Sequence, residues 1–184
     1  MLYTRKGDTG TTKTFGCDQR VSKSSTIAEA LGSLDEINSF LGICKVKSEK
    51  EKIMFSNELS CAQIVHEVQK NLFIVQAELA GSNMSIEERK VKETEFFIDE
   101  IEKMLPPIKS FFISGGTELA ATFDTARTIS RRAERRVVGV NEEKDRSVGE
   151  FTLAYLNRLS SLLYALARLS NHKLGIEEES PDYK

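Results

Sequence analysis

The sequence TIAEALGSLDEINSFLGIC, at residues 26–44, indicates the fold class. Its apolar residues recur every three or four positions, at Ile27, Leu31, Leu34, Ile37, Leu41 and Cys44. Side chains at this spacing lie on one face of an α-helix, because the helix completes a turn about every 3.6 residues. The segment is therefore predicted to be an amphipathic helix that packs its apolar face against neighbouring helices.

The same spacing returns in a second and a third segment. The apolar positions of the second are Cys61, Val65, Val68, Leu72, Val75 and Leu79, and the Gly-Ser-Asn sequence at residues 81–83 stops this helix. A third helix is expected to begin at a capping box formed by Ser85 and Glu88. Pro106 and Pro107 end it, since proline cannot continue a helix.

Two further helices follow an apolar linker, FFISGG, at residues 111–116. They are expected over about residues 117–138 and 147–171, with a polar loop at 141–146 between them and Gly175 as the C′ residue. We find no internal repeat and no strand pattern. The sequence predicts one all-α domain over residues 1–184, a bundle of five helices. Its parts are a glycine-rich loop at 1–24, the bundle at 25–175 and an acidic tail at 176–184, of which we expect residues 177–184 to be mobile.

Composition limits the function further. The chain has 184 residues, of which 40% are hydrophobic, enough for one well-buried domain. A net charge of −2 argues against a general nucleic-acid binder. Cys17, Cys44 and Cys61 show no metal-site spacing, which favours reduced thiols in a cytoplasmic protein. No apolar run approaches the length of about 18 residues that a membrane span needs, and we expect no targeting segment before the glycine-rich loop.

The first sixteen residues carry chemistry that suits a polyanion. Residues 3–16 hold three glycines, five threonines and three cations. Glycine lets backbone N–H groups approach phosphate oxygens, while hydroxyls and cationic side chains add donors and charge. The alternative is a flexible terminus. The loop is not a Walker A motif, because Thr12 stands where the second glycine belongs and no buried strand precedes it.

A second cluster lies in the predicted fourth helix. Arg127, Arg131 and Arg135 fall within about 80° of arc, and Glu134 lies in the same sector. Three guanidinium groups with one carboxylate suit recognition of a triphosphate, with Glu134 orienting an arginine or holding a cation. The alternative is an ordinary solvated face with local ion pairs.

Polar residues also interrupt the apolar faces of two other helices. Asn157 and Arg158 lie in a leucine-rich helix, where an amide buried at a helix seam must bond a neighbouring helix or a ligand. An asparagine that sets the helix register is the alternative. Asp35, in the first helix, could pair with one of the arginines, within one chain or across a subunit interface.

Read together, these motifs resemble the PduO-type ATP:cob(I)alamin adenosyltransferases, also called ATP:corrinoid adenosyltransferases. The blocks that carry the resemblance are YTRKGDTGTT at 3–12, RVSK at 20–23, EALGSLDEINS at 29–39, GG at 115–116, ARTISRRAER at 126–135 and YLNRLS at 155–160. They follow the family's order and span most of the chain.

The resemblance implies a homotrimer of ferritin-like, left-handed bundles with active sites between subunits. One subunit would bind the ATP triphosphate through Thr4, Arg5, Lys6, Gly7, Gly10, Thr12, Lys13 and Lys23. The neighbouring subunit would contribute Arg131, Arg132, Ala133, Glu134, Arg135 and Asn157. Glu134 would lie near Mg²⁺, and some members of the family also bind K⁺ beside the phosphates.

The resemblance also implies the reaction. Cob(I)alamin attacks C5′ of ATP, which forms adenosylcobalamin and expels triphosphate, so no protein nucleophile is needed. Arg131, Glu134, Asp35 and Arg127 would serve catalysis, the last two as an intersubunit pair. Phe111 or Phe112 would lie below the corrin ring, exclude the lower axial ligand and favour an easily reduced four-coordinate Co(II).

Three positions depart from the family pattern. Ser114 stands where proline is usual, Asp124 where histidine is common and Ser161 where aspartate usually follows. We expect these departures to affect rate and corrinoid affinity and to leave the reaction class unchanged.

Two other functions are alternatives to transfer. A regulator or carrier of the same fold could bind ATP or corrinoid without turnover. A ferritin-like di-metal protein fails, because Gln63 and Leu169 precede His66 and His172 where glutamate is required. We expect no nucleic-acid or membrane partner, and a reductase or a B12-dependent enzyme stays open as a protein partner.

Overall fold

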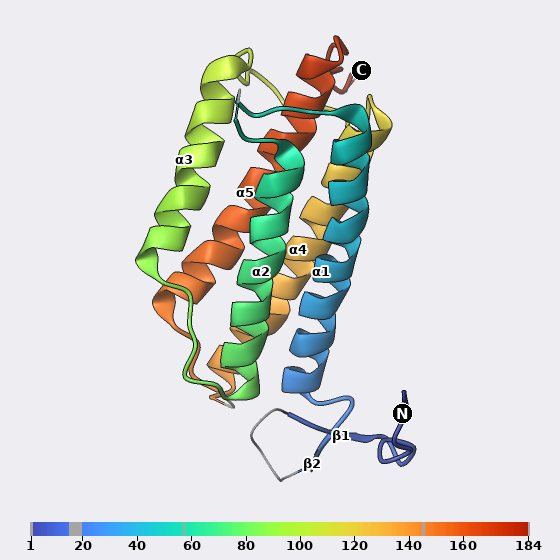
Figure 1. Cartoon of the computed structure of the whole chain (residues 1–184), viewed down its shortest axis with the longest axis vertical. Coiled ribbons are helices and arrows are strands. Elements are labelled where there is room, and N and C mark those ends of the chain that lie inside the picture. The colour runs from blue at the N-terminus through green and yellow to red at the C-terminus, as the bar shows by residue number, and fades with distance from the viewer. Residues whose placement is uncertain (1, 15–19, 57, 145, 184) are drawn as a thin grey trace.

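The computed structural model describes residues 2–14, 20–56, 58–144 and 146–183. The described residues form five helices that lie side by side (Figure 1), which confirms the predicted number. They are α1 (Thr26–Glu51), α2 (Cys61–Ala80), α3 (Glu88–Met104), α4 (Glu118–Glu142) and α5 (Glu150–Lys173). None of the described helices is long and apolar enough to cross a membrane.

The helices share one apolar core. α4 packs against α1 and α5, α1 also packs against α2, and α5 also packs against α3. Of the apolar residues that predicted the first two helices, all are buried except Leu31, which is partly buried. Cys44 and Cys61 belong to this core as free thiols, whereas Cys17 lies outside the described residues. Burial raises the pKa of both core thiols to about 12, so neither is a ready nucleophile at neutral pH.

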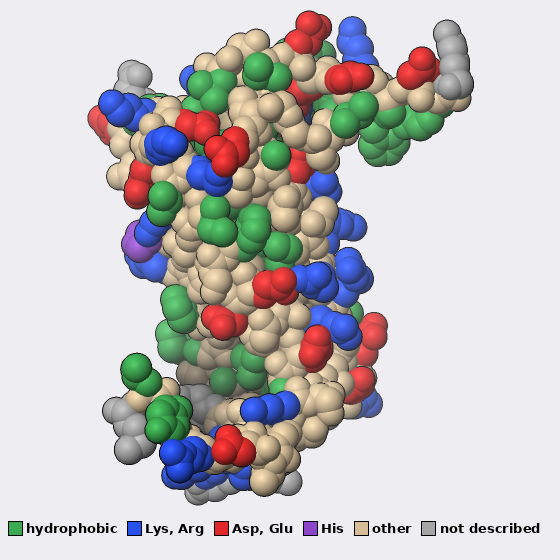
Figure 2. Space-filling model, turned by 90° about the vertical axis from the view of Figure 1, so that its right-hand side faces the viewer, with side chains coloured by type: hydrophobic (Ala, Val, Ile, Leu, Met, Phe, Trp, Pro, Cys, Tyr) green, Lys and Arg blue, Asp and Glu red, His purple; other side chains and the backbone are tan. Residues whose placement is uncertain are grey.

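Charged side chains are spread over the outside of the helices, among several exposed apolar ones. Ion pairs join α1 to α4 between Glu36 and Arg132 and between Lys47 and Glu118. Figure 2 shows acidic and basic side chains interspersed over one side of the molecule. Both pairs are at the surface, where such contacts contribute at most about 1 kcal/mol each, so the core supplies most of the stability.

The predicted end of α2 is confirmed, whereas the predicted start of α3 is not. Gly81 caps α2 in the left-handed region with φ 104°, as predicted. The capping box predicted at Ser85 is wrong, because α3 begins after Glu87 and has no side-chain cap. The N–H of the buried residue Ile86 donates instead to Thr152 Oγ1 (3.3 Å), which ties this segment to α5. The structure has a capping box at Ser60 and Gln63 that the sequence reading missed.

α4 and α5 differ from their predicted ranges at the loop that joins them. α4 continues through Glu142 because Val140 extends its buried face by a turn. α5 starts later than predicted, at Glu150, and the carboxylate of Glu78 on α2 accepts the Gly149 N–H (2.8 Å) at its beginning. The predicted stop at Gly175 is confirmed by its φ of 72°.

The N-terminal segment contains two short strands, although no strand was expected. β1 (Thr11–Lys13) pairs antiparallel with β2 (Arg20–Ser22), with Thr12 opposite Val21. Strands of three residues are too short to show apolar alternation, which explains why the sequence did not reveal them. In Figure 1 this segment extends from the lower end of the helices, next to the start of α1. Figure 2 shows Lys and Arg side chains gathered at that end.

Candidate active site

A cavity of about 610 Å³ lies between the linker that precedes α4 and the helices α4 and α5. Linker residues 108–115 form one wall. The helices and the C-terminal tail supply the rest, which includes Asp124, Arg127, Arg131, Ser160, Ser161, Tyr164, Ala167, Arg168, Asn171 and Glu178. The cavity therefore combines aromatic and apolar surface with a few charged groups, as small-molecule sites commonly do.

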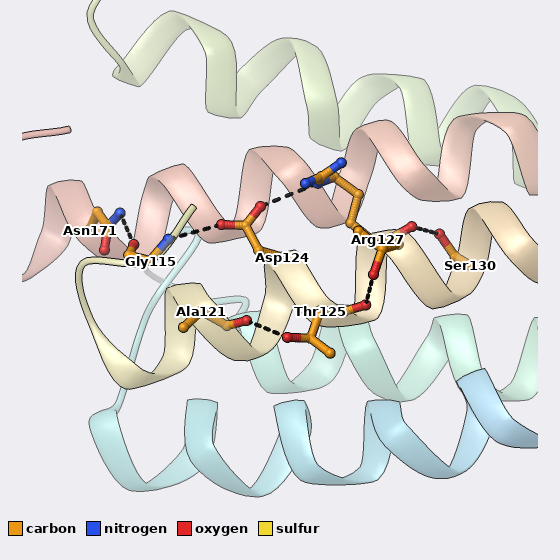
Figure 3. A network of polar contacts seen from close by, with 8 residues as sticks. Gly115, Ala121, Asp124, Thr125, Arg127, Ser130 and Asn171 are labelled. Carbon is orange, nitrogen blue, oxygen red and sulfur yellow. Dashed lines mark hydrogen bonds and ion pairs between the residues drawn. The ribbon is translucent and has the colours of Figure 1, made fainter. Parts of the chain in front are cut away.

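The linker is attached to both helices through Gly115 (Figure 3). Its N–H donates to Asp124 Oδ2 on α4 (3.3 Å), and its carbonyl accepts from Asn171 Nδ2 on α5 (2.8 Å). Asn171 Oδ1 also accepts the Thr117 N–H (2.9 Å). Gly116 must be glycine here, because its φ is 96° and a Cβ would lie 2.6 Å from Asn171 Oδ1.

The two linker phenylalanines have different surroundings. Phe111 is 80% exposed at the cavity. Phe112 is partly buried, and the Arg168 guanidinium lies 5.0 Å from the centre of its ring, within cation–π range. Phe112 is therefore held by the protein, whereas the ring of Phe111 is presented to solvent.

The C-terminal tail, which we expect from its sequence to be mobile, is bonded to the linker and to α5 in the structure. Arg168 is only 4% exposed, and its Nε donates to Glu178 Oε2 (2.8 Å). The Ile113 N–H donates to the Glu179 carbonyl (2.8 Å), and the Ser110 and Ser180 hydroxyls are 2.6 Å apart. A buried guanidinium needs a carboxylate partner, and here the tail provides it.

Only part of the predicted arginine face lines the cavity. Arg127 and Arg131 both line the cavity, and Arg131 and Arg135 are exposed. Arg127 Nε donates to Asp124 Oδ1 (3.2 Å), so this arginine has a partner within its own chain. Arg132 lies away from the cavity wall and pairs with Glu36. The side chain of Ala133 is buried in the core, so it does not contact a ligand that binds at the surface.

Asn157 and Glu134 are brought together by α4 and α5. Asn157 Nδ2 donates to Glu134 Oε1 (2.9 Å), and Arg158 Nη1 donates to Asn157 Oδ1 (2.8 Å). Arg158 Nε in turn donates to Glu95 Oε1 on α3 (2.9 Å). Asn157 is exposed, so its expected burial at a seam is wrong, although it does bond a neighbouring helix. This chain of contacts orients the Glu134 carboxylate at the surface.

The N-terminal segment brings several predicted phosphate-binding residues together. A Cβ at Gly7 would lie 3.1 Å from Lys23 Nζ, so the lysine side chain packs directly over this glycine. The Lys23 N–H donates to the Gly10 carbonyl (2.9 Å), and Gly10 has a φ of 78°. The Lys6 N–H donates to Thr4 Oγ1 (3.4 Å), which curls the chain just before Gly7.

Arg20 is a residue of this segment that the sequence reasoning missed as an individual. Its guanidinium donates to Thr11 Oγ1 (2.8 Å), to the Thr11 carbonyl (2.7 Å) and to the Lys6 carbonyl. The only signal for it was its place in the RVSK block. Arg20 therefore joins the cationic turn at Lys6 to the two-stranded sheet.

Asp35 lies apart from the cavity. It lines a separate groove of about 560 Å³ together with Leu31, Phe73, Gln76, Ala77, Ala80, Ser82 and Met84. Phe73 and Met84 are exposed there. Since Arg127 lines the other cavity and bonds Asp124, the single chain does not unite Asp35 with Arg127. Their pairing across subunits stays a prediction.

Comparison with known proteins supports one family for this fold and site. The family model described as cobalamin adenosyltransferase matches residues 2–170. The chain is 38% identical to the corrinoid adenosyltransferase PduO of Citrobacter freundii, over 93% of this chain and 50% of that protein. It is 36% identical to the corrinoid adenosyltransferase of Bacillus subtilis, over 95% of this chain and 89% of that protein.

A solved structure agrees with the sequence relatives. A variant of the PduO-type ATP:corrinoid adenosyltransferase from Lactobacillus reuteri, complexed with cobalamin and ATP, superposes with a TM-score of 0.88 at 28% identity. The match covers 100% of this chain and 97% of that one. The chain spans about half the length of the two PduO relatives from Citrobacter freundii and Salmonella typhimurium. The chain belongs to the cobalamin adenosyltransferase family.

Proposed function

We propose that this protein transfers the 5′-deoxyadenosyl group of ATP to cob(I)alamin or a related corrinoid. The products are the adenosylated corrinoid and triphosphate. The observation that carries the proposal is the position of Arg131, which lines the large cavity and lies on the same helix as Glu134, the carboxylate that accepts from Asn157 on α5. A corrinoid in the cavity and a triphosphate along α4 would then share this arginine.

The reaction requires alignment and charge compensation more than acid–base chemistry. The Co(I) electron pair forms a bond to C5′ while the C5′–O bond breaks, and triphosphate leaves with that electron pair. The protein has to hold cobalt and C5′ in line and to stabilise the charge on the leaving group. Buried thiols with a pKa of about 12 fit this chemistry, because no protein nucleophile takes part.

The ATP site is proposed to be divided between two subunits of a homotrimer of helical bundles. Two observations support this division. The cationic N-terminal segment extends beyond the end of its own helices (Figure 1). The groove that contains Asp35 also exposes Phe73 and Met84, an apolar surface that a second copy could cover.

The carboxylate of Glu134 is suited to hold a magnesium ion in this site. The described residues contain no cluster of three or more His, Cys, Asp or Glu side chains able to hold a metal. Mg²⁺ in nucleotide sites commonly binds one or two carboxylates together with substrate phosphates, so a single carboxylate is sufficient. Glu134, oriented by Asn157, would hold the ion. When bound, it would neutralise charge on the triphosphate.

The corrinoid is proposed to occupy the large cavity, with Phe111 against its lower face. The exposed ring of Phe111 supports this choice over Phe112, which already packs beneath Arg168. The three departures from the family pattern, Ser114, Asp124 and Ser161, all line this cavity. They are therefore expected to change the affinity for corrinoid more than the affinity for ATP.

An anaerobic turnover assay tests the proposal. The protein is mixed with ATP, Mg²⁺ and chemically reduced cob(I)alamin, and the Co(I) spectrum is followed while triphosphate is quantified. Loss of the Co(I) spectrum with an equal amount of triphosphate is expected. Measurable ATP binding with a persistent Co(I) spectrum would favour a regulator or carrier of the same fold.

A further inference from the structure

Asp124 occupies the junction between the linker and α4 (Figure 3). Its side chain is 13% exposed and its two oxygens have different partners. Oδ2 accepts the Gly115 N–H (3.3 Å), and Oδ1 accepts Arg127 Nε (3.2 Å). One carboxylate thus connects the backbone of the cavity wall to a guanidinium of the same cavity.

The partners of Asp124 explain why a carboxylate suits this position. Both the Gly115 N–H and Arg127 Nε are donors, so the side chain at 124 must offer two acceptors. A carboxylate has two acceptor atoms, whereas an amide has one, its oxygen, and a neutral imidazole has one, a ring nitrogen. The guanidinium also supplies the opposite charge that a largely buried carboxylate requires.

Gly115 is held from a second helix as well. Its carbonyl accepts from Asn171 Nδ2 on α5 (2.8 Å), and Asn171 is itself buried. The neighbouring Gly116 is packed so closely against Asn171 that no side chain fits there. The end of the linker is therefore fixed between α4 and α5, while Phe111, four residues earlier, is exposed at the cavity.

We propose that Asp124 is a positioning residue for the corrinoid. Asp124 fixes the position of the linker through its bond to Gly115, and it fixes the orientation of Arg127 through the ion pair. The linker wall and the α4 wall of the cavity therefore keep a constant position relative to each other. This inference rests on the proposed function, since it assumes that a corrinoid binds in the cavity. It predicts an effect confined to the corrinoid, because Asp124 bonds Gly115 and Arg127 at the cavity, whereas Glu134 is oriented separately by Asn157.

The test separates binding of the two substrates in the full chain. Asp124→Asn and Asp124→Ala are compared with Asp99→Asn, a matched control on the exposed face of α3. The Kd values for cob(II)alamin and for ATP with Mg²⁺ are measured separately, and melting temperatures check the fold. Both variants are expected to weaken cob(II)alamin binding by about tenfold, as loss of a hydrogen bond to a charged group would. The Kd for ATP is expected to change by less than about twofold, since independent sites do not couple.

A double substitution adds a readout that general destabilisation would not produce. Asn171→Ala releases the same glycine from the other helix. If both residues act through the linker, the pair Asp124→Ala and Asn171→Ala weakens cob(II)alamin binding by less than the product of the single effects.

The outcomes decide the inference clearly. Unchanged cob(II)alamin affinity in both Asp124 variants overturns it, and so does an equal loss of affinity for ATP and corrinoid. Wild-type protein that binds cob(II)alamin without turning over would contradict the proposed activity and leave the Asp124 comparison intact. Wild-type protein that binds no corrinoid would overturn both.

Discussion

The large cavity and the N-terminal segment are built in opposite ways. Within one chain, the cavity is lined by the linker, two helices and the tail, and its wall is fixed at Gly115 by Asp124 and Asn171. The N-terminal segment extends from the end of the helices and is organised by backbone pairing and by Arg20. A single chain can therefore hold its cavity in shape, while the segment that we propose to bind phosphate depends on local contacts and, in the same proposal, on a neighbouring subunit.

The largest expected effect comes from the residue where the two regions would meet. Arg131→Ala should lower turnover by about a thousandfold, because the guanidinium would stabilise charge on the leaving triphosphate. Helix content, measured by circular dichroism, should stay unchanged, since the side chain is exposed. Arg136→Ala, also exposed on α4, is the matched control and should remain active. Near-normal turnover of Arg131→Ala would contradict the assignment.

The next effect concerns the cavity alone. Phe111→Ala should slow adenosylation from Co(II) by about tenfold or more, because an apolar ring at the lower face favours the state that is easier to reduce. Adenosylation from pre-reduced Co(I) should be slowed much less. Phe96→Ala, at an exposed phenylalanine on α3, is the control. Equal slowing from both oxidation states would indicate that Phe112 or another group guards the lower face.

A third change addresses the N-terminal segment alone. Arg20→Ala removes the bonds to Thr11 and Lys6 and should raise the KM for ATP by about tenfold, while the KM for corrinoid stays close to wild type. Arg89→Ala on the exposed surface of α3 controls for the loss of one cation. An increase in both KM values would show that the two regions are coupled within one chain.

The smallest effect is expected at the tail. Glu178→Gln leaves the buried Arg168 without its carboxylate and should lower the free energy of unfolding by about 1 to 2 kcal/mol. The loss is measured by urea denaturation, with the exposed neighbour Glu177→Gln as control. Corrinoid affinity should weaken a few-fold, because Glu178 lines the cavity. Identical denaturation midpoints for the two variants would show that the tail does not stabilise the cavity wall.

Local sequence patterns predicted the positions of the helices better than they predicted the contacts between distant segments. The apolar spacing of Leu34, Ile37 and Leu41 and the glycine stops at Gly81 and Gly175 are confirmed, because helix periodicity and left-handed caps depend on a few adjacent residues. The capping box at Ser85 failed because Ile86 bonds Thr152, 66 positions later. A distant contact of that kind leaves no mark in the local sequence.

The candidate site shows the same division. The pattern of the fourth helix predicted a face with Arg127 and Arg131, and the structure places both at one cavity. The pattern could not predict that Asp124 would bond Arg127, that Asn157 would be exposed, or that the acidic tail would pack against the linker. Each of these outcomes depends on how the helices and the linker pack. The spacing of residues along the chain does not reveal that packing.

The sequence alone predicts five helices, a cationic glycine-rich segment and the residues that resemble one family, because these depend on residue type and short-range spacing. The cavity and the groups that face it depend instead on how the helices and the linker pack. The bond from Asn171 to Gly115 spans 56 positions, and the one from Asp124 spans nine. They meet because burial of the apolar faces brings α4 and α5 together and carries these polar side chains to one wall of the cavity.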